Sequence, residues 1–239
     1  NRHEFRKLEG LVSENEVIGD VPDSVVIEQN GLKFAVPIKT GQKTGFFFDQ
    51  RENRDFLKHF FSGRKVLDLY CYHGAFALCA AASGAKAVWG VDSSASAVEM
   101  AVKNAALNGL EDKAVFHRDN AEEVLAGLKA GETPESPDFT ILDPPNLVRN
   151  RKTMPQARKL YVKLNQAAVS VLPKGGLLAT SSCSHHVTRE TFVDILREAS
   201  ARAGRRTILV ELRGQASDHP VLMSMPETEY LHFALIRVV

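Results

Sequence analysis

Short apolar segments alternate with helix-forming segments from about residue 55 to the end of the chain. The apolar segments are rich in Val, Leu, Ile and Phe, as buried strands are, and the segments between them carry Ser caps and Gly stops. Regular alternation of this kind predicts an α/β fold: a seven-stranded, mostly parallel sheet with helices on both faces. We expect strands at 64–70, 87–91, 113–117, 139–142, 177–181, 207–212 and 230–237, and helices at 74–83, 94–107, 155–172 and 188–203.

A β-hairpin is expected ahead of this alternating region. Two β-rich runs, 25–29 and 32–36, flank Asn30-Gly31, and both of these residues accept the positive φ angles of a type I′ turn. We therefore divide the chain into a small hairpin-bearing lead-in, residues 1–54, and an α/β domain, residues 55–239.

Aspartates lie at or just beyond the ends of four successive predicted strands, at positions 68, 92, 119 and 143. Ligands of parallel α/β sheets bind beyond the carboxyl ends of the strands, where the strand order reverses. Helix capping is the alternative explanation for any one such Asp, but it is a weaker one for four in series. We therefore expect a binding site at this edge of the sheet.

The loop after the first strand of the sheet indicates which ligand binds there. It has no G-x-G-x-x-G pattern, and the chain has no P-loop, so the motifs that cradle a pyrophosphate are absent. Asp92 is positioned to accept hydrogen bonds from both hydroxyls of a ribose, and Asp119-Asn120 to contact an adenine edge. A ribose and an adenine without a pyrophosphate suggest S-adenosylmethionine.

Composition excludes several classes and hides a segregation of charge. Three cysteines are too few for a disulfide scaffold and indicate a reducing cytoplasm, and no apolar run is long enough to span a bilayer. The net charge is only +1, yet residues 144–189 contain no Asp or Glu and eight Lys or Arg, which leaves 22 basic and 29 acidic residues elsewhere. Local cationic surface of this kind favours an RNA partner, although a solvated helix face would give the same pattern.

Four motifs resemble those of Rossmann-like S-adenosylmethionine-dependent methyltransferases: VLDLYCYHGAF at 66–76, WGVDSS at 89–94, HRDNAEE at 117–123 and ILDPPN at 141–146. Three more, GQKTGFFFDQRENR at 41–54, TSSCSHHV at 180–187 and SDHPV at 217–221, resemble the bacterial 23S rRNA (cytosine-C5) methyltransferase family. The resemblance implies 23S rRNA as the partner, with a homodimer as one expected state. Members of that family often carry an N-terminal PUA-type RNA-binding domain, which these residues do not resemble, so a truncated chain is expected.

The same resemblance implies which residues contact the cofactor. Gln50 belongs to an F-x-Q type of motif and is expected against the methionine part of S-adenosylmethionine. The full set of expected cofactor contacts is Gln50, Asp68, Tyr70, Cys71, Gly74, Asp92, Ser93, Asp119, Asn120 and Asp143.

The chemistry of cytosine C5 explains why a cysteine and an aspartate are needed. C5 is a poor nucleophile, and covalent catalysis solves this when a thiolate adds to C6 and N3 receives a proton or a strong hydrogen bond. The fourth and fifth strands are neighbours in this fold, so Asp143 and Cys183 should emerge side by side, as the N3 partner and the nucleophile. On the substrate side we expect Pro144, Pro145, Arg149, Arg151 and Lys152.

Other chemistries are weighed against this one. The Cys and His spacings match no structural zinc pattern, so no metal is expected, and Cys79 is interpreted as a core residue. Asn146 stands where members of the cytosine family often have Lys, which leaves the target base open. One alternative is an rRNA methyltransferase acting on guanine N7 or an exocyclic amine without a thiol, and another is an RNA-binding module that has lost catalysis.

Overall fold

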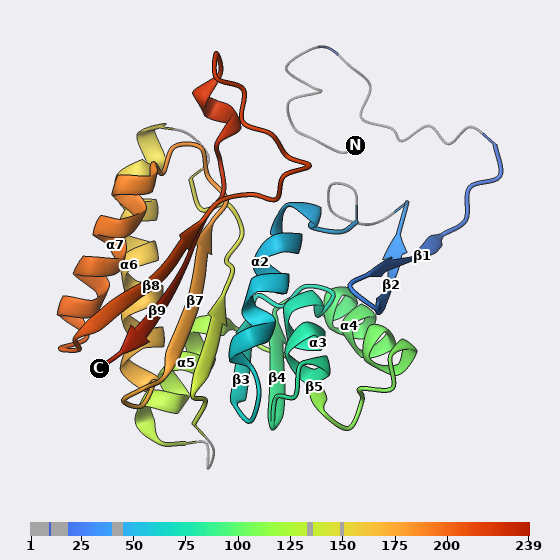
Figure 1. The fold of residues 1–239 in the computed structure, drawn as a ribbon, viewed down its shortest axis with the longest axis horizontal. Coiled ribbons are helices and arrows are strands. Elements are labelled where there is room, and N and C mark those ends of the chain that lie inside the picture. The colour runs from blue at the N-terminus through green and yellow to red at the C-terminus, as the bar shows by residue number, and fades with distance from the viewer. Residues whose placement is uncertain (1–9, 11–18, 40–44, 133–135, 149–150) are drawn as a thin grey trace.

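A computed structural model of the chain describes residues 19–39, 45–132, 136–148 and 151–239, together with Gly10. Seven strands form one sheet in the order β5-β4-β3-β6-β7-β9-β8 (Figure 1). All pairs are parallel except those of β9, which runs antiparallel to both β7 and β8. The predicted α/β sheet is confirmed. Its strands are β3 Lys65–Leu69, β4 Ala87–Asp92, β5 Ala114–Arg118, β6 Phe139–Leu142, β7 Leu177–Ser182, β8 Thr207–Arg213 and β9 His232–Val238.

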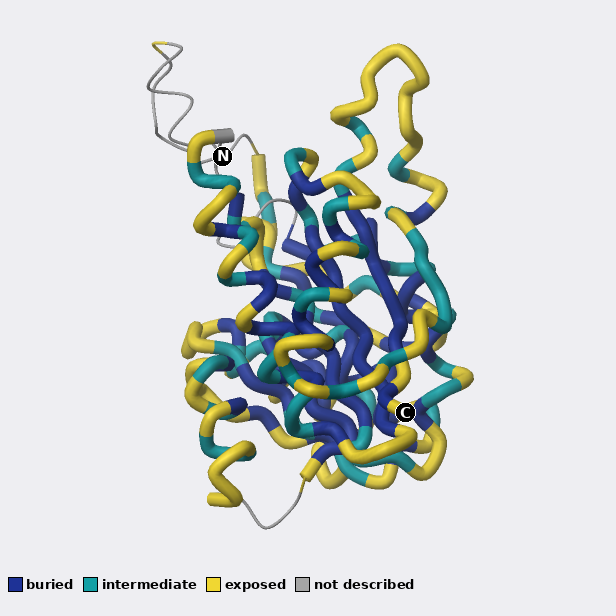
Figure 2. Tube along the Cα trace, turned by 90° about the vertical axis from the view of Figure 1, so that its left-hand side faces the viewer, coloured by how far each residue is buried: buried dark blue, intermediate teal, exposed yellow. Residues whose placement is uncertain are grey.

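Helices cover both faces of the sheet, and the core lies in the two layers between them and the strands (Figures 1 and 2). The first layer is closed by α2 Arg51–Leu57, α3 Ala75–Ala82 and α4 Ala95–Leu107. The second is closed by α5 Ala121–Ala130, α6 Met154–Val171 and α7 Arg189–Arg202. Within the described part of the chain, no helix is long and apolar enough to cross a membrane.

The hairpin consists of β1 Ser24–Gln29 and β2 Leu32–Pro37. Its turn residues have φ angles of 55° at Asn30 and 77° at Gly31, which is why Asn-Gly suits this turn. β2 lies against α4, where the side-chain oxygens of Asn104 and Asn108 accept hydrogen bonds from backbone N–H groups of β2 at 2.8 Å. Apolar side chains of β2 share a core cluster with α3 and β3, and residue 54 lies inside α2. The division at residue 54 therefore stays a prediction.

Two helices were not predicted from the sequence. α5 begins at an Asn120 cap, whose side chain accepts from the N–H groups of Glu122 and Glu123, and it ends at Gly131 with φ 76°. An Asn cap and a Gly stop are standard signals for the start and end of a helix, so α5 was predictable from the sequence. α2 is only seven residues long and follows the 3₁₀ helix η1 Phe48–Gln50, so it has little periodicity to detect.

Candidate active site

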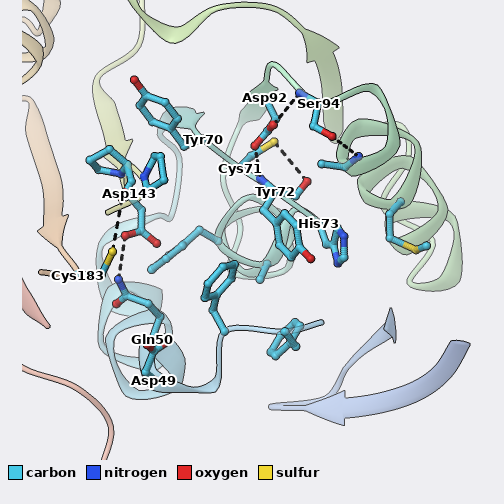
Figure 3. A pocket seen from close by; sticks show the side chains of 18 of the residues that line it. Asp49, Gln50, Tyr70, Cys71, Tyr72, His73, Asp92, Ser94, Asp143 and Cys183 are labelled. Carbon is cyan, nitrogen blue, oxygen red and sulfur yellow. Dashed lines mark hydrogen bonds between the residues drawn. The ribbon is translucent and has the colours of Figure 1, made fainter. Parts of the chain in front are cut away.

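A cavity of about 640 Å³ opens at the carboxyl ends of the central strands (Figure 3). The loops after β3, β4, β6 and β7 form most of its wall, and Pro37 of the hairpin with Phe46 and Phe47 closes one side. Its volume is within the range of about 300–1,000 Å³ that is usual for small-molecule sites. The cavity lies next to the point where the strand order reverses, between β3 and β6, as expected for this fold.

Asp143 and Cys183 both line this cavity. Asp143 directly follows β6 and Cys183 directly follows β7, and these two strands pair in parallel register. The Cys183 Sγ lies 4.0 Å from the carbonyl oxygen of Pro144, beside the Asp143 carboxyl group. The structure thus brings the two residues together as the strand order predicted, while their chemical roles stay predictions.

The carboxyl group of Asp143 is held by two donors. Its Oδ1 accepts a hydrogen bond from Gln50 Nε2 at 3.0 Å and another from the Ser181 hydroxyl. Burial raises the pKa of Asp143 to about 6, and the negative charge of Asp49 also raises it, while the two hydrogen bonds and Arg54 lower it. A carboxyl group with this pKa can carry a proton near neutral pH.

Asp49 is a buried neighbour of this pair that the sequence analysis missed. Its Oδ2 accepts a 2.9 Å hydrogen bond from the Tyr230 hydroxyl. Its Oδ1 is buried without a hydrogen-bond partner among the described residues. Asp49 is among the residues that line the cavity, as is Gln50. Only its place beside Gln50 in the F-x-Q motif could have drawn attention to it.

The loop after β3 wraps around Asp92. Asp92 accepts hydrogen bonds from the backbone N–H groups of Tyr72 at 3.0 Å and Ser94 at 2.9 Å. Tyr70 and Tyr72 have φ angles of 62° and 49°, so this loop is a strained backbone held by its surroundings. Four predicted cofactor contacts line the cavity here: Tyr70, Cys71, Asp92 and Ser93.

Two other predicted cofactor contacts lie beneath the cavity rather than in its wall. Asp68 is buried in β3 and accepts a 2.9 Å hydrogen bond from the N–H of Ala77, in the first turn of α3. Burial raises the pKa of Asp68 well above its usual range, and the charge of Asp143 adds to this. Gly74 begins α3 with φ 80°, and a Cβ there would lie 2.8 Å from the ring of Phe116. Both residues shape the loop from below.

Asp119 and Asn120 also lie outside the cavity wall. Asp119 follows β5 and its Oδ1 accepts from the N–H of Asn120 at 2.7 Å. The side-chain oxygen of Asn120 caps α5. Their expected contact with an adenine edge stays a prediction.

The substrate-side residues are only partly described. Pro144 and Pro145 line the cavity, Lys152 is exposed in the 3₁₀ helix η3 Arg151–Thr153, and Arg149 and the side chain of Arg151 lie outside the described part of the chain.

Some basic residues of the segment 144–189 have acidic partners in the structure, and the predicted cationic surface stays a prediction. Arg158 pairs with Glu198 of α7 at 2.6 Å, and Lys163 pairs with Glu122 of α5 at 2.5 Å. Lys174 lies in the turn before β7, at the opposite edge of the sheet from the cavity. Acidic residues of neighbouring helices neutralise charges that look unbalanced along the sequence.

Cys79 is not among the residues that line the cavity. Cys79 is buried, with its Sγ 3.3 Å from the carbonyl oxygen of Arg54, in agreement with a core role. Among the residues that the structure describes, no three His, Cys, Asp or Glu side chains come together as metal ligands.

Comparison with known proteins decides the family. The sequence profile of the S-adenosylmethionine-dependent methyltransferases matches residues 11–223. The chain belongs to this methyltransferase family. The predicted cofactor, S-adenosylmethionine, is confirmed by the same match.

Curated relatives of this methyltransferase include ribosomal RNA large subunit methyltransferase I from Tolumonas auensis, which is 40% identical over 98% of the chain. The protein of the same name from Erwinia tasmaniensis is 38% identical over 98% of the chain. In both cases the match covers 59% of the relative, so the chain spans about three-fifths of their length.

Solved structures confirm the fold. The methyltransferase SMU.776, crystallised with SAH, superposes with a TM-score of 0.83 at 24% identity, covering 98% of this chain and 64% of that one. An S-adenosylmethionine-dependent methyltransferase from Streptococcus mutans gives a TM-score of 0.82 at 23% identity, covering 98% of this chain and 63% of that one.

The hydrogen-bond acceptors around the cavity fit the cofactor of this family. The methionine part of S-adenosylmethionine carries an ammonium and a sulfonium, and the cavity offers the carboxyl groups of Asp49 and Asp143 at one end. The buried Oδ1 of Asp49 has no hydrogen-bond partner in the described part of the chain, so it can accept a hydrogen bond from a bound group. At the other end, each carboxylate oxygen of Asp92 accepts one backbone N–H and keeps a lone pair for a ribose hydroxyl.

Proposed function

We propose that this methyltransferase methylates C5 of a cytosine in 23S rRNA through a covalent bond between Cys183 and C6. One observation carries the proposal: a cysteine thiol and a carboxyl group with a raised pKa line one cavity, at the ends of two neighbouring strands. The names of the curated relatives support ribosomal RNA of the large subunit as the substrate.

Each of the two residues has a distinct role in this proposal. The Cys183 thiolate adds to C6 while Asp143 gives N3 a proton or a strong hydrogen bond, which turns C5 into an enamine carbon. S-adenosylmethionine supplies the methyl group. Loss of the C5 proton to water then restores the C5–C6 double bond and expels the Cys183 thiolate, and N3 returns its proton to Asp143. The raised pKa of Asp143 favours the protonated form that the first step requires.

The RNA is proposed to approach along the loop that follows β6. Pro144 and Pro145 would border the target base, and Arg149, Arg151 and Lys152 would contact the phosphate backbone. A cytosine must leave its stack to reach a cavity at the end of a sheet, so a loop or an unpaired strand is the expected substrate. Three further points stay proposals. They are the division of the chain at residue 54 into a lead-in and a domain, a homodimer, and a cytoplasmic location.

A trapping experiment tests the mechanism. RNA that contains 5-fluorocytosine cannot lose a proton from C5 after methyl transfer, so the bond to Cys183 should persist and appear as a protein–RNA adduct by mass spectrometry. Cys183→Ser should form no adduct. Cys79→Ala, which changes a buried core cysteine, should form it as the unchanged protein does.

The product identifies the base independently. Nucleoside mass spectrometry of RNA treated with the enzyme should find 5-methylcytosine. Finding 7-methylguanosine or an N-methylated base, or finding full activity in Cys183→Ser, would overturn the proposal.

A further inference from the structure

A chain of hydrogen bonds runs from β8 to the carboxyl group of Asp143. Arg213 Nε donates to Asn53 Oδ1 at 3.1 Å, and Asn53 Nδ2 donates to Gln50 Oε1 at 2.7 Å. Gln50 Nε2 then donates to Asp143 Oδ1 at 3.0 Å. The exposed fractions of Asn53 and Gln50 are 1% and 2%, so water cannot substitute for these partners.

Arg213 fixes the direction of every hydrogen bond in this series. A guanidinium can only donate, so the Asn53 oxygen must face Arg213. The Asn53 amide nitrogen must then face the other way, where it meets Gln50 Oε1 and, at 3.1 Å, the carbonyl oxygen of Gly214. Gln50 is left with its nitrogen toward Asp143, although an isolated amide could turn either end to a carboxyl group.

The end of the chain determines which oxygen of Asp143 can hold a proton. Oδ1 accepts from two donors, Gln50 and the Ser181 hydroxyl, which occupy its lone pairs. Oδ2 accepts no hydrogen bond from the described residues, and the carboxyl group points toward the cavity (Figure 3). A proton on Asp143 therefore belongs on Oδ2, the oxygen that a bound base would meet.

We propose that Asn53 is a positioning residue, which holds the Gln50 amide so that the acid proton of Asp143 is kept on Oδ2 and directed at the base. The role in catalysis rests on the proposed function, in which Asp143 serves N3 of cytosine. With the Gln50 amide reversed, its oxygen would face Oδ1 and draw the proton away from the cavity.

Other charged and titratable groups lie around Asp143, but they do not replace the hydrogen bonds from Arg213 through Asn53 to Gln50. Asp49 of η1 and Arg54 of α2 act on it through space, as does Asp68 of β3. Tyr161 of α6 and Cys183 lie near it on the β7 side. None of these five groups sets the orientation of the Gln50 amide.

The test measures Asp143 directly, without RNA. The ¹³C resonance of its carboxyl carbon is followed by NMR against pH in the full chain, and Asp143→Asn assigns the signal. Asn53→Ala and Arg213→Met should raise the pKa of Asp143, because a misplaced amide no longer stabilises the carboxylate. Loss of one such hydrogen bond corresponds to a fall on the order of tenfold in the acid dissociation constant.

Two matched variants separate this role from a structural one. Arg213→Lys keeps a donor that can only donate and should leave the pKa of Asp143 near that of the unchanged protein. Asn165→Ala removes a different buried amide, which donates to the Tyr161 carbonyl oxygen, and should also leave it unchanged. In methylation assays Asn53→Ala should lower kcat on the order of tenfold with little change in KM for RNA, and Arg213→Lys should not.

An unchanged pKa of Asp143 in folded Asn53→Ala, or an equal shift in Asn165→Ala, would overturn the proposal. A raised pKa in Asn53→Ala supports the positioning role even if the methylated base proves not to be cytosine. A methylated base other than cytosine would contradict only the proposed function. Failure of the proposed function and failure of the positioning role can therefore be distinguished.

Discussion

The carboxyl group of Asp143 is subject to opposing influences. Burial and the charge of Asp49 favour the protonated form, while hydrogen bonds from Gln50 and Ser181 favour the carboxylate. Burial prevails, so the folded protein holds this proton to a higher pH than an unfolded chain does. That difference links the protonation of one residue to the stability of the whole domain.

Asp143 should make the protein less stable as the pH rises. Its pKa is raised from 3.8 to about 6, so its stabilising contribution is complete below pH 4 and is lost between pH 4 and pH 6. The loss is on the order of 3 kcal/mol. Urea denaturation at pH 4 and pH 8 should show that Asp143→Asn gains stability relative to the unchanged protein at the higher pH. A stability difference that does not depend on pH would contradict this.

Gly74 is needed for its small size and its backbone angle. Its φ is 80°, and an added Cβ would lie 2.8 Å from the Phe116 ring. Gly74→Ala should lower the free energy of unfolding by about 2 kcal/mol, and calorimetry should find weaker S-adenosylmethionine binding because the loop after β3 shifts. Gly109→Ala is a control: its φ is 61° but a Cβ there would meet no atom within 4 Å, so it should be tolerated better.

The residues at strand ends were predictable from the sequence, but their supporting contacts were not. Asp143 and Cys183 follow apolar runs that read as adjacent strands, so topology alone brings them together. Arg213 and Asn53 are 160 positions apart, and nothing local in either segment indicates the pairing. Amide orientation depends on three-dimensional neighbours.

At the level of elements, the hairpin is attached through two asparagines of α4. Asn104 is fully buried and its side chain bonds to two segments at once: its oxygen accepts from Ala35 N–H, and its nitrogen donates to the His73 carbonyl oxygen at 3.1 Å. The hairpin and the loop after β3 are therefore held by one side chain. Asn108 makes a comparable contact with Lys33 in a more exposed place.

Asn104→Ala should loosen the hairpin without unfolding the sheet. One partly buried and one buried backbone group would lose their partners, at a cost of about 2–4 kcal/mol. Hydrogen exchange should show faster exchange of the Ala35 amide, with little change in β6 and β7. Asn108→Ala should have a smaller effect, and equal protection of the Ala35 amide in Asn104→Ala would contradict the role given to Asn104.

Elements were predicted where chemical signals were strong. Asn30-Gly31 identified the hairpin turn, and Ser94 and Thr188 do cap α4 and α7. The strand ends moved by one or two residues, as with β9, which begins at His232. A short helix such as α2 depends on the packing of Phe56 and Leu57 against the core, and no local pattern reveals that packing.

At the scale of the whole molecule, charge cannot be judged from its order in the sequence. The acidic partners of Arg158 and Lys163 come from α7 and α5, which the fold places beside α6. If the proposed RNA substrate enters the cavity, we expect the basic residues near the cavity to contribute most to its binding.

Lys152 and Lys174 test this view. Lys152 is exposed in η3, on the loop that leads from the cavity, and Lys174 is exposed at the opposite edge of the sheet. Lys152→Ala should reduce the slope of log affinity for RNA against log salt concentration by roughly one. Lys174→Ala should leave the slope unchanged, and equal effects of the two variants would mean that the RNA is not confined to the cavity side.

The antiparallel course of β9 sets where the last residue lies. The carbonyl oxygen of Val238 accepts from Gly175 N–H at 2.8 Å, and Val239 N–H donates to Arg206 at 2.9 Å, so both sit at the sheet edge remote from the cavity. Val238 is six positions along β9 from His232, a span of about 20 Å. A fluorophore or surface linker attached at Val239 would therefore leave the mouth of the cavity clear, so that single enzyme molecules could be immobilised and watched as they capture and release RNA.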